Sequence, residues 1–119
     1  MRQSTVEILA KTYRDRMTVK RSVPEIDLET QESRMVLRTV YEEEPCALSQ
    51  KANNKPERKE AHSEATMEAV IFSRPSIFLE DNDVVELVTE AGQQLRGKSG
   101  KTFGYVSHGE TTFYVDKLT

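Results

Sequence analysis

The chain has 119 residues, enough for one domain with a single core, and its 31% charged content makes it polar for a globular protein. A net charge of -3 argues against a domain that binds nucleic acid by neutralising phosphates. One cysteine excludes an internal disulfide, and with two histidines there is no zinc-ligand spacing, so we expect no metal and no cofactor. No stretch resembles a signal peptide or a membrane span, so we expect a cytosolic protein without membrane contact.

The chain is predicted to begin with one helix and to continue as strands. Ser4 and Glu7 form a capping-box pattern, and apolar residues at helical spacing predict a helix over residues 4–14. The apolar period then changes to two, which is typical of strands. The predicted strands are 16–20, 35–41, 46–49, 66–72, 84–88, 101–107 and 111–115.

Polar segments between these strands predict the connections. Residues 22–33 are expected to form an exposed hairpin connection, and the acidic run with a proline at 42–45 is expected to break the strand pairing. Residues 92–100 are expected to be a mobile connection. Six or so short strands with one helix predict a single domain over residues 1–119, a mainly β fold built as a small antiparallel β-barrel.

A long inserted loop is predicted over residues 50–65, because this stretch contains no large apolar side chain. Structureless loops of this length inside a compact domain are usually functional or disordered. Its polar and charged members are the candidate residues of the loop: Gln50, Lys51, Asn53, Asn54, Lys55, Glu57, Arg58, Lys59, Glu60, His62 and Glu64.

Charge is distributed unevenly along the chain. Residues 1–20 carry an excess of basic side chains, whereas residues 80–90 carry acidic side chains and no basic one. This asymmetry suits head-to-tail contacts between identical subunits. The candidate subunit or adaptor contacts are Arg14, Arg16, Glu80, Asp81 and Asp83.

Residues 92–99 match the phosphate-loop pattern G-x-x-x-x-G-K-[ST], and a predicted strand precedes them. Phosphate binding at this motif requires a helix directly after the lysine, so that the helix N-terminus can hold the phosphates. Residues 101–106 instead have the pattern of a strand. We therefore favour a flexible hairpin connection over a nucleotide site.

Cys46 is the only candidate nucleophile of its type, with His62 or His108 as conceivable bases. Cys46 lies in an apolar alternation, and both histidines lie in polar turns with nothing to orient a base, so a core cysteine is favoured. The acidic run at 42–44 is interpreted as a solvated edge rather than a cation site. The sequence therefore predicts no enzyme.

Several segments together resemble one protein family. Residues 13–19 and 40–49, followed by 69–75, 80–85 and 105–108, are similar in order and spacing to the head-completion proteins of long-tailed phages and prophages of Gram-positive hosts. These are also known as stopper proteins of the head-to-tail connector. The resemblance covers nearly the whole chain, and its weight comes from the shared order of short segments.

The resemblance implies a role in the phage particle. Such a protein is a small β-barrel, monomeric in isolation, that forms a ring of twelve subunits below the portal and its adaptor after DNA packaging. The ring closes the exit channel, meets packaged DNA without sequence-specific binding, and offers a surface to the tail-completion protein. The family's long loop blocks the channel, and here it corresponds to residues 50–65. The expected location is the host cytoplasm during assembly and then the head-tail junction of the virion.

Two alternatives remain open from the sequence. A tail-completion protein of the same junction is also small and ring-forming. The other alternative is an OB-like barrel that binds single-stranded nucleic acid, with Phe103, Tyr105, Phe113 and Tyr114 as stacking platforms.

Overall fold

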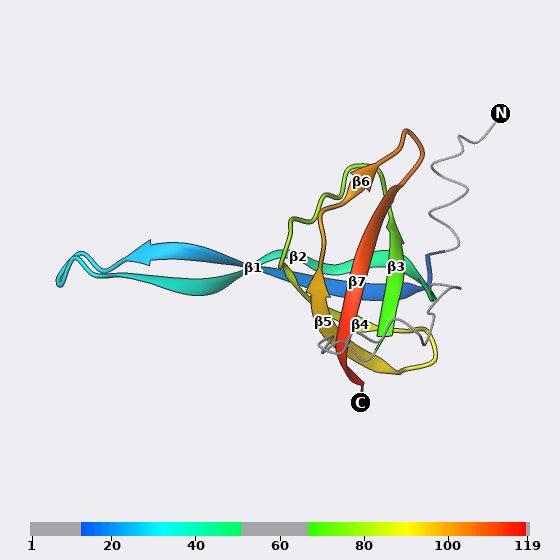
Figure 1. Cartoon of the computed structure of the whole chain (residues 1–119), viewed down its shortest axis with the longest axis horizontal. Coiled ribbons are helices and arrows are strands. Elements are labelled where there is room, and N and C mark those ends of the chain that lie inside the picture. Colours follow the sequence, from blue (N-terminus) through cyan, green and yellow to red (C-terminus); the bar gives the residue numbers. More distant parts are fainter. Residues whose placement is uncertain (1–12, 51–66, 119) are drawn as a thin grey trace, which may run out of the picture.

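The computed structural model describes residues 13–50 and 67–118, all of which belong to one antiparallel β structure (Figure 1). The predicted helix over residues 4–14 lies outside the described residues except for its last two positions, which are not helical. No membrane-crossing helix is found in the described part of the chain. The strands are β1 (Asp15–Ile26), β2 (Ser33–Gln50), β3 (Met67–Ser73), β4 (Val84–Val88), β5 (Gln94–Ser99), β6 (Phe103–Gly104) and β7 (Gly109–Leu118).

Six of the strands form a closed circuit of hydrogen bonds. The sheet order is β3-β2-β1-β4-β5-β7-β6, and an additional pairing between β3 and β7 joins the two sides. All pairings are antiparallel, and the short β6 pairs with the first two residues of β7. We call the circuit of β1, β2, β3, β7, β5 and β4 the closed sheet. Closure removes most exposed strand edges from this part of the molecule.

The core fills the inside of the closed sheet because alternate residues of each strand face inward. In β3 and β5 every second residue is buried, and Phe113 of β7 is completely inaccessible to solvent. The buried cluster takes members from all six strands of the closed sheet and from the connection before β4. Its members are Met17, Val19, Cys46, Ala69, Ile71, Ile77, Leu79, Val85, Leu87, Leu95, Phe113 and Val115.

The segment expected to be a mobile connection, residues 92–100, is mostly strand β5. Leu95, Gly97 and Ser99 face the core, while the polar residues between them face outward and hide the alternation. Gly97 is required by packing, because a Cβ at this position would collide with the backbone carbonyl oxygen of Tyr114 on β7. The prediction of a flexible connection here is therefore wrong.

Strand β2 also departs from the predicted pattern, because it continues through the acidic run at 42–45. The pairing with β1 shifts register between Met17 and Val19, and Glu43 adopts a positive φ of 52°. Such β-bulges bend a strand without ending it. The expected break is therefore a bend within one strand of 18 residues.

The expected hairpin connection over residues 22–33 is shorter than predicted. β1 continues to Ile26 and β2 begins at Ser33, so only the residues between them turn. The N–H of Asp27 donates to the carbonyl oxygen of Glu32 at 2.9 Å, which closes the turn. The predicted strand over 101–107 is reduced to two residues of β6.

Candidate functional site

The first candidate feature is a two-stranded ribbon that leaves the closed sheet. β1 pairs with β4 only as far as Lys20, and β2 pairs with β3 only from Cys46 onward. Residues 21–26 and 33–38 therefore pair only with each other, and Figure 1 shows them projecting from the body. Six residue pairs correspond to roughly 20 Å of strand. We call these residues and the turn at 27–32 the arm.

The two faces of the arm differ in chemistry, because residues opposite each other in an antiparallel pair share a face. On one face Glu25 lies 3.7 Å from Arg34 and 3.9 Å from Arg38, beside the half-buried Val23 and Val36. We call this the charged face.

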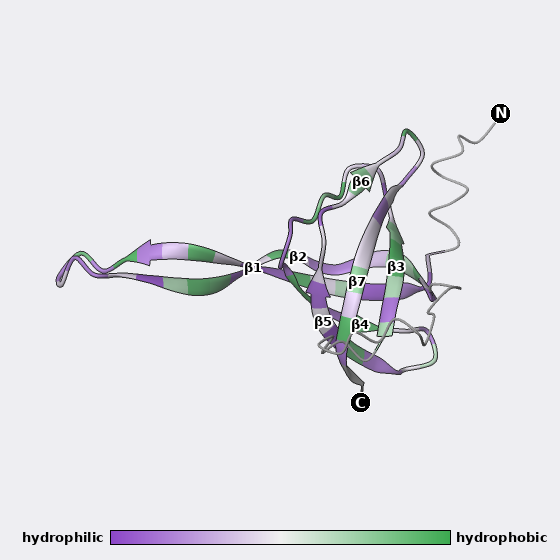
Figure 2. Cartoon of the chain, in the orientation of Figure 1, coloured by the Kyte–Doolittle hydropathy of each residue, from purple (hydrophilic) through white to green (hydrophobic). Residues whose placement is uncertain are grey.

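The opposite face carries no charge. The pairs Ser22–Leu37, Pro24–Met35 and Ile26–Ser33 place four apolar side chains there, at Pro24, Ile26, Met35 and Leu37. Ile26 is 63% exposed and Met35 62% exposed, and the apolar segments are visible on the arm in Figure 2. We call this the apolar face. Sequence reasoning missed it because residues 22–33 were interpreted as a connection, although the alternation of Pro24 and Ile26 was the available signal.

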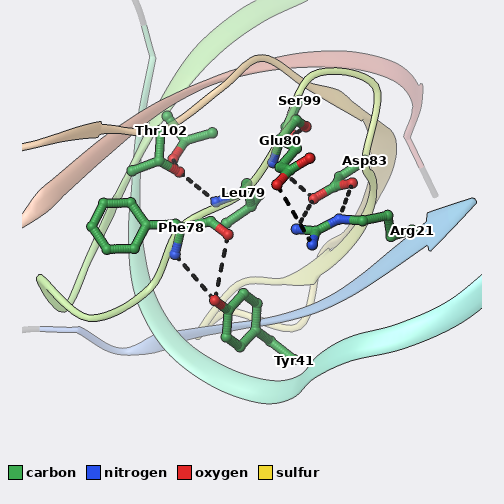
Figure 3. Close-up of polar contacts among 9 residues, drawn as sticks. Arg21, Tyr41, Phe78, Leu79, Glu80, Asp83, Ser99 and Thr102 are labelled. Atoms are coloured by element: carbon green, nitrogen blue, oxygen red, sulfur yellow. Dashed lines mark hydrogen bonds and ion pairs between the residues drawn. The ribbon is translucent and has the colours of Figure 1, made fainter. Parts of the chain in front are cut away.

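The base of the arm is held to the body by a buried carboxylate (Figure 3). Arg21 donates to both oxygens of Asp83, at 3.0 and 2.8 Å, and Asp83 is only 2% exposed. Asp83 also accepts the N–H of Glu80 at 2.9 Å. The hydrogen bonds with Asp83 raise the pKa of Arg21 above its usual value. A bidentate pair of this kind fixes orientation as well as position.

A second contact joins β2, three residues beyond the arm, to the connection before β4. The Tyr41 hydroxyl accepts the N–H of Phe78 at 3.1 Å and lies 3.4 Å from the Phe78 carbonyl oxygen (Figure 3). The next residue, Leu79, donates its N–H to the Thr102 hydroxyl at 2.8 Å. The same connection therefore contacts both β2 and the segment that leads to β6.

Aromatic side chains gather around β6. Phe103 and Tyr105 lie 5.0 Å apart between ring centroids and are 64% and 47% exposed. Val106 is 95% exposed, and a Cβ at Gly104 would approach the Phe78 ring to 3.1 Å, which places Phe78 beside β6. We call the group of Phe78, Phe103, Tyr105 and Val106 the aromatic end.

His108 lies against the aromatic end and has two polar partners. Its ring stacks on Tyr105 with centroids 5.0 Å apart, while Nδ1 lies 2.9 Å from the Ser107 hydroxyl and Nε2 lies 2.9 Å from the Glu110 carboxylate. The premise that nothing orients this histidine is therefore wrong. Ser107 precedes His108 directly and Glu110 lies at the start of β7, and their contacts hold the imidazole ring in its stacked position.

Cys46 is fully buried in the core, as predicted. Burial, with smaller effects from the carboxylates of Asp15 and Glu44, raises the pKa of its thiol to about 12. The thiol is therefore protonated at neutral pH and is a poor nucleophile.

The residues of the phosphate-loop match lie in β5 and the turn before it. Gly97 and Lys98 pair with β4 on one side and β7 on the other, in the extended conformation of a strand. Ser99 is buried, and its hydroxyl donates to the Glu80 carbonyl oxygen at 3.2 Å. Neither the curled backbone nor the following helix of a phosphate loop is present in this segment.

The predicted contact residues have different surroundings. Arg14 forms an exposed ion pair with Glu90 at 3.4 Å. One basic residue of the N-terminal region and one acidic residue of the 80–90 region therefore compensate each other within one chain. The guanidinium of Arg16 donates to the Asp15 carbonyl oxygen at 3.2 Å. Glu80 and Asp81 are exposed, whereas Asp83 is buried at the base of the arm and has almost no surface to offer a neighbour.

The predicted loop residues lie outside the described residues, except Gln50. This residue ends β2 and pairs with Ala69 of β3. The segment 51–66 therefore connects two strands that are hydrogen-bonded neighbours.

A surface depression of about 430 Å³ lies near Thr18 and Glu43. Glu86, which also lines it, is already compensated by Lys20 at 3.5 Å and Arg96 at 3.7 Å. The charge of Glu86 is therefore compensated within the chain.

No protein-family model, curated protein or solved structure matches this chain. Across residues 13–50 and 67–118, no three His, Cys, Asp or Glu side chains lie close enough together to hold a metal ion. The exposed features that remain are the apolar face of the arm and the aromatic end.

Proposed function

We propose that this chain is a structural phage protein, a head-completion or stopper subunit that forms a ring of twelve copies below the portal and adaptor. The ring closes the DNA exit channel after packaging and provides the surface to which the tail-completion protein attaches. The proposal starts from the family resemblance of five segments in order. The observation that carries it is the projecting arm with an exposed, uncharged apolar face, a feature suited to assembly with other protein surfaces.

The closed sheet agrees with the expected subunit, which is a small β-barrel. Six strands form the circuit, and completely buried side chains such as Phe113, Ile71 and Met17 fill its inside. A barrel of this size is packed with side chains and leaves no internal channel. In this proposal DNA passes through the ring of subunits and not through the single barrel, and it is not bound in a sequence-specific way.

Channel closure is assigned to residues 50–65 on the basis of their composition and the family resemblance. Because Gln50 pairs with Ala69, the closed sheet can be joined by a shorter turn at this place. Deletion of residues 51–63 should therefore leave a folded subunit but give heads that lose DNA. Particles that retain DNA normally with this deletion would show that the segment is not the gate.

Electron microscopy of particles assembled without the protein is the direct test of the whole proposal. We expect full-sized heads that lack tails and lose their DNA. The same particles supplied with purified protein should regain tails. Normal tailed particles formed in its absence would refute the role in head completion. Tailless heads that keep their DNA would instead favour the tail-completion role at the same junction.

One observation favours a second candidate function, binding of single-stranded nucleic acid. Phe103 and Tyr105 are exposed neighbours that could each stack on a base, whereas Phe113 is buried and cannot. A titration with labelled single-stranded oligonucleotides at low salt discriminates between the two functions. Saturable binding that is lost on Phe103→Ala would favour this candidate, and a head-completion subunit should show none.

A further inference from the structure

We propose that the apolar face of the arm docks on the aromatic end of a second copy of this chain. The contact is head to tail, because each copy offers its arm to one neighbour and its aromatic end to another. This inference does not depend on the proposed function, since it concerns the purified chain alone. It identifies the surfaces through which copies meet, which were not among the contact residues predicted from the sequence.

The arm is a surface without a partner in the monomer. An isolated two-stranded ribbon is at best marginally stable in water, and three strands or a packed face are normally needed. Here one face is stabilised by the Glu25 ion pairs and the half-buried valines. The other face leaves Ile26, Met35 and Leu37 each more than half exposed. A partner that covers this face would remove several hundred Å² of apolar surface from water, which is the size of the patches that mark interaction sites.

The aromatic end is the matching surface on the body. Phe78, Phe103, Tyr105 and Val106 are all more than two-fifths exposed, and none carries a charge. Aromatic side chains are enriched at protein interfaces because they bury a large area with few rotatable bonds. Figure 1 shows β6 near one end of the closed sheet and the arm projecting in another direction, so both surfaces are open at the same time.

The charges of the arm and of the residues near Phe103 favour contact between the arm and the aromatic end over contact between two arms. The turn of the arm carries Asp27, Glu29 and Glu32, none of which has an ion pair within the described part of the chain. Lys101 precedes Phe103 of the aromatic end by two residues, is exposed, and likewise has no ion pair there. Glu110, which lies opposite Phe103, is hydrogen-bonded to His108. An acidic turn therefore finds a cation beside the aromatic end, whereas two arms in contact would bring their acidic turns together.

The contact is expected to be weak between two free subunits. A stable interface usually buries about 800 Å² on each partner, which is more than the apolar face alone can supply. A heterologous contact repeats from copy to copy and produces a closed ring or a helical filament. Each copy in a ring uses both of its surfaces, so the arrangement becomes stable when copies are concentrated.

The test uses cysteine pairs in the purified full chain. Met35→Cys is mixed with Val106→Cys and treated with a short bifunctional thiol cross-linker. Both positions are exposed, and the native Cys46 does not compete because it is buried. Arg34→Cys is the matched control, because it lies one residue away on the charged face. We expect the Met35–Val106 pair to cross-link about tenfold faster than the Arg34–Val106 pair at equal concentration, since docking raises the effective concentration of the thiols.

The possible outcomes distinguish the occupants of the apolar face. Cross-linking of Met35→Cys mainly to itself would show contact between two arms and overturn the proposal. Equal rates for Met35 and Arg34 would mean that no specific face is used, and would also overturn it. Neither result would contradict the proposed role in head completion, because that role is tested on assembled particles.

Sedimentation equilibrium over a wide concentration range gives a second measurement. Met35→Ser should lower the association constant about tenfold, because one large side chain is then lost from the contact. Arg34→Ser should change it little. A wild-type chain that remains monomeric at every concentration would show that a second copy is not the partner of the arm.

Discussion

The arm is a continuation of β1 and β2, two of the six strands of the closed sheet, yet the two regions differ in the burial of their apolar side chains. Within the closed sheet, Met17 and Val19 of β1 are inaccessible to solvent. A few residues later in the same strand, Ile26 is 63% exposed. Apolar residues recur at alternate positions in both segments, and the number of neighbouring strands changes from two to one. The comparison teaches that one strand can supply the core of a subunit at one end and a surface for assembly at the other.

The largest effect that tests this comparison is loss of a core side chain. Phe113→Ala removes a completely buried ring from the closed sheet, and we expect a loss of about 3–5 kcal/mol in the free energy of unfolding. Met35→Ala on the arm should cost less than about 0.5 kcal/mol, because its side chain is mostly exposed. Urea titration followed by circular dichroism measures both. Equal losses would mean that the arm is part of the same core.

The next effect concerns the junction between the two regions. Asp83→Ala leaves the partly buried Arg21 without its bidentate partner, and we expect a loss of about 2–3 kcal/mol, reduced because Arg21 can reach water. Hydrogen exchange should become faster in residues 21–26 and 33–38. Asp81→Ala, two residues away and exposed, is the matched control and should change neither. Unchanged exchange in the arm of the Asp83 variant would show that the clamp does not order the arm.

The pH dependence of stability tests the burial of Cys46 in the closed sheet. The pKa of Cys46 is raised from 9.0 to about 12 by burial, so the folded state keeps a proton that the unfolded state loses first. The contribution of the Cys46 thiol to the free energy of unfolding is fully present below pH 9. Between pH 9 and 12 the free energy of unfolding falls by about 1.4 kcal/mol per pH unit because of this thiol. Wild type should therefore lose stability more steeply in this range than Cys46→Ala, as measured by urea midpoints. Parallel profiles for the two proteins would contradict the burial of the thiol.

The smallest effect tests the contact at Tyr41. Tyr41→Phe removes the hydroxyl that accepts the N–H of Phe78, and we expect a loss of about 0.5–1 kcal/mol. Tyr114→Phe is the control, because Tyr114 is exposed on β7 and its hydroxyl has no hydrogen bond within residues 13–50 and 67–118. A larger loss in the control would contradict the role assigned to Tyr41.

The sequence predicted the parts of the fold in which apolar alternation and burial agree. Residues 84–88 and 111–115 follow that rule and are strands, and Cys46 is in the core. β5 could not be predicted in this way, because its inward residues include Gly97 and Ser99, which carry no apolar signal. The small size of Gly97 is explained by the backbone of β7, which is distant in sequence.

The apolar face of the arm was harder to predict, because its apolar residues alternate with polar and charged residues of the opposite face. In the arm, Glu25 and Arg34 are paired across the strands and cover one face, which gives the sequence the composition of a loop. The burial of Asp83 depends on Arg21, which is 62 residues away in the chain. Contacts of this kind are set by tertiary structure and leave no local pattern. The segment 50–65 stays a prediction, since all but its first residue lies outside the described part of the chain.

The bend in β2 at Glu43 has a geometric consequence for any assembly of copies. β2 is one continuous strand from the arm into the closed sheet, and its bulge sets the direction in which the arm leaves the body. If copies dock through their arms, this direction determines the rotation and the rise from one copy to the next. A rise of zero with a rotation that divides the full turn into whole steps closes a ring, and other combinations produce a spiral. The symmetry of the assembly would then be encoded in the backbone angles of a single acidic residue and its neighbours.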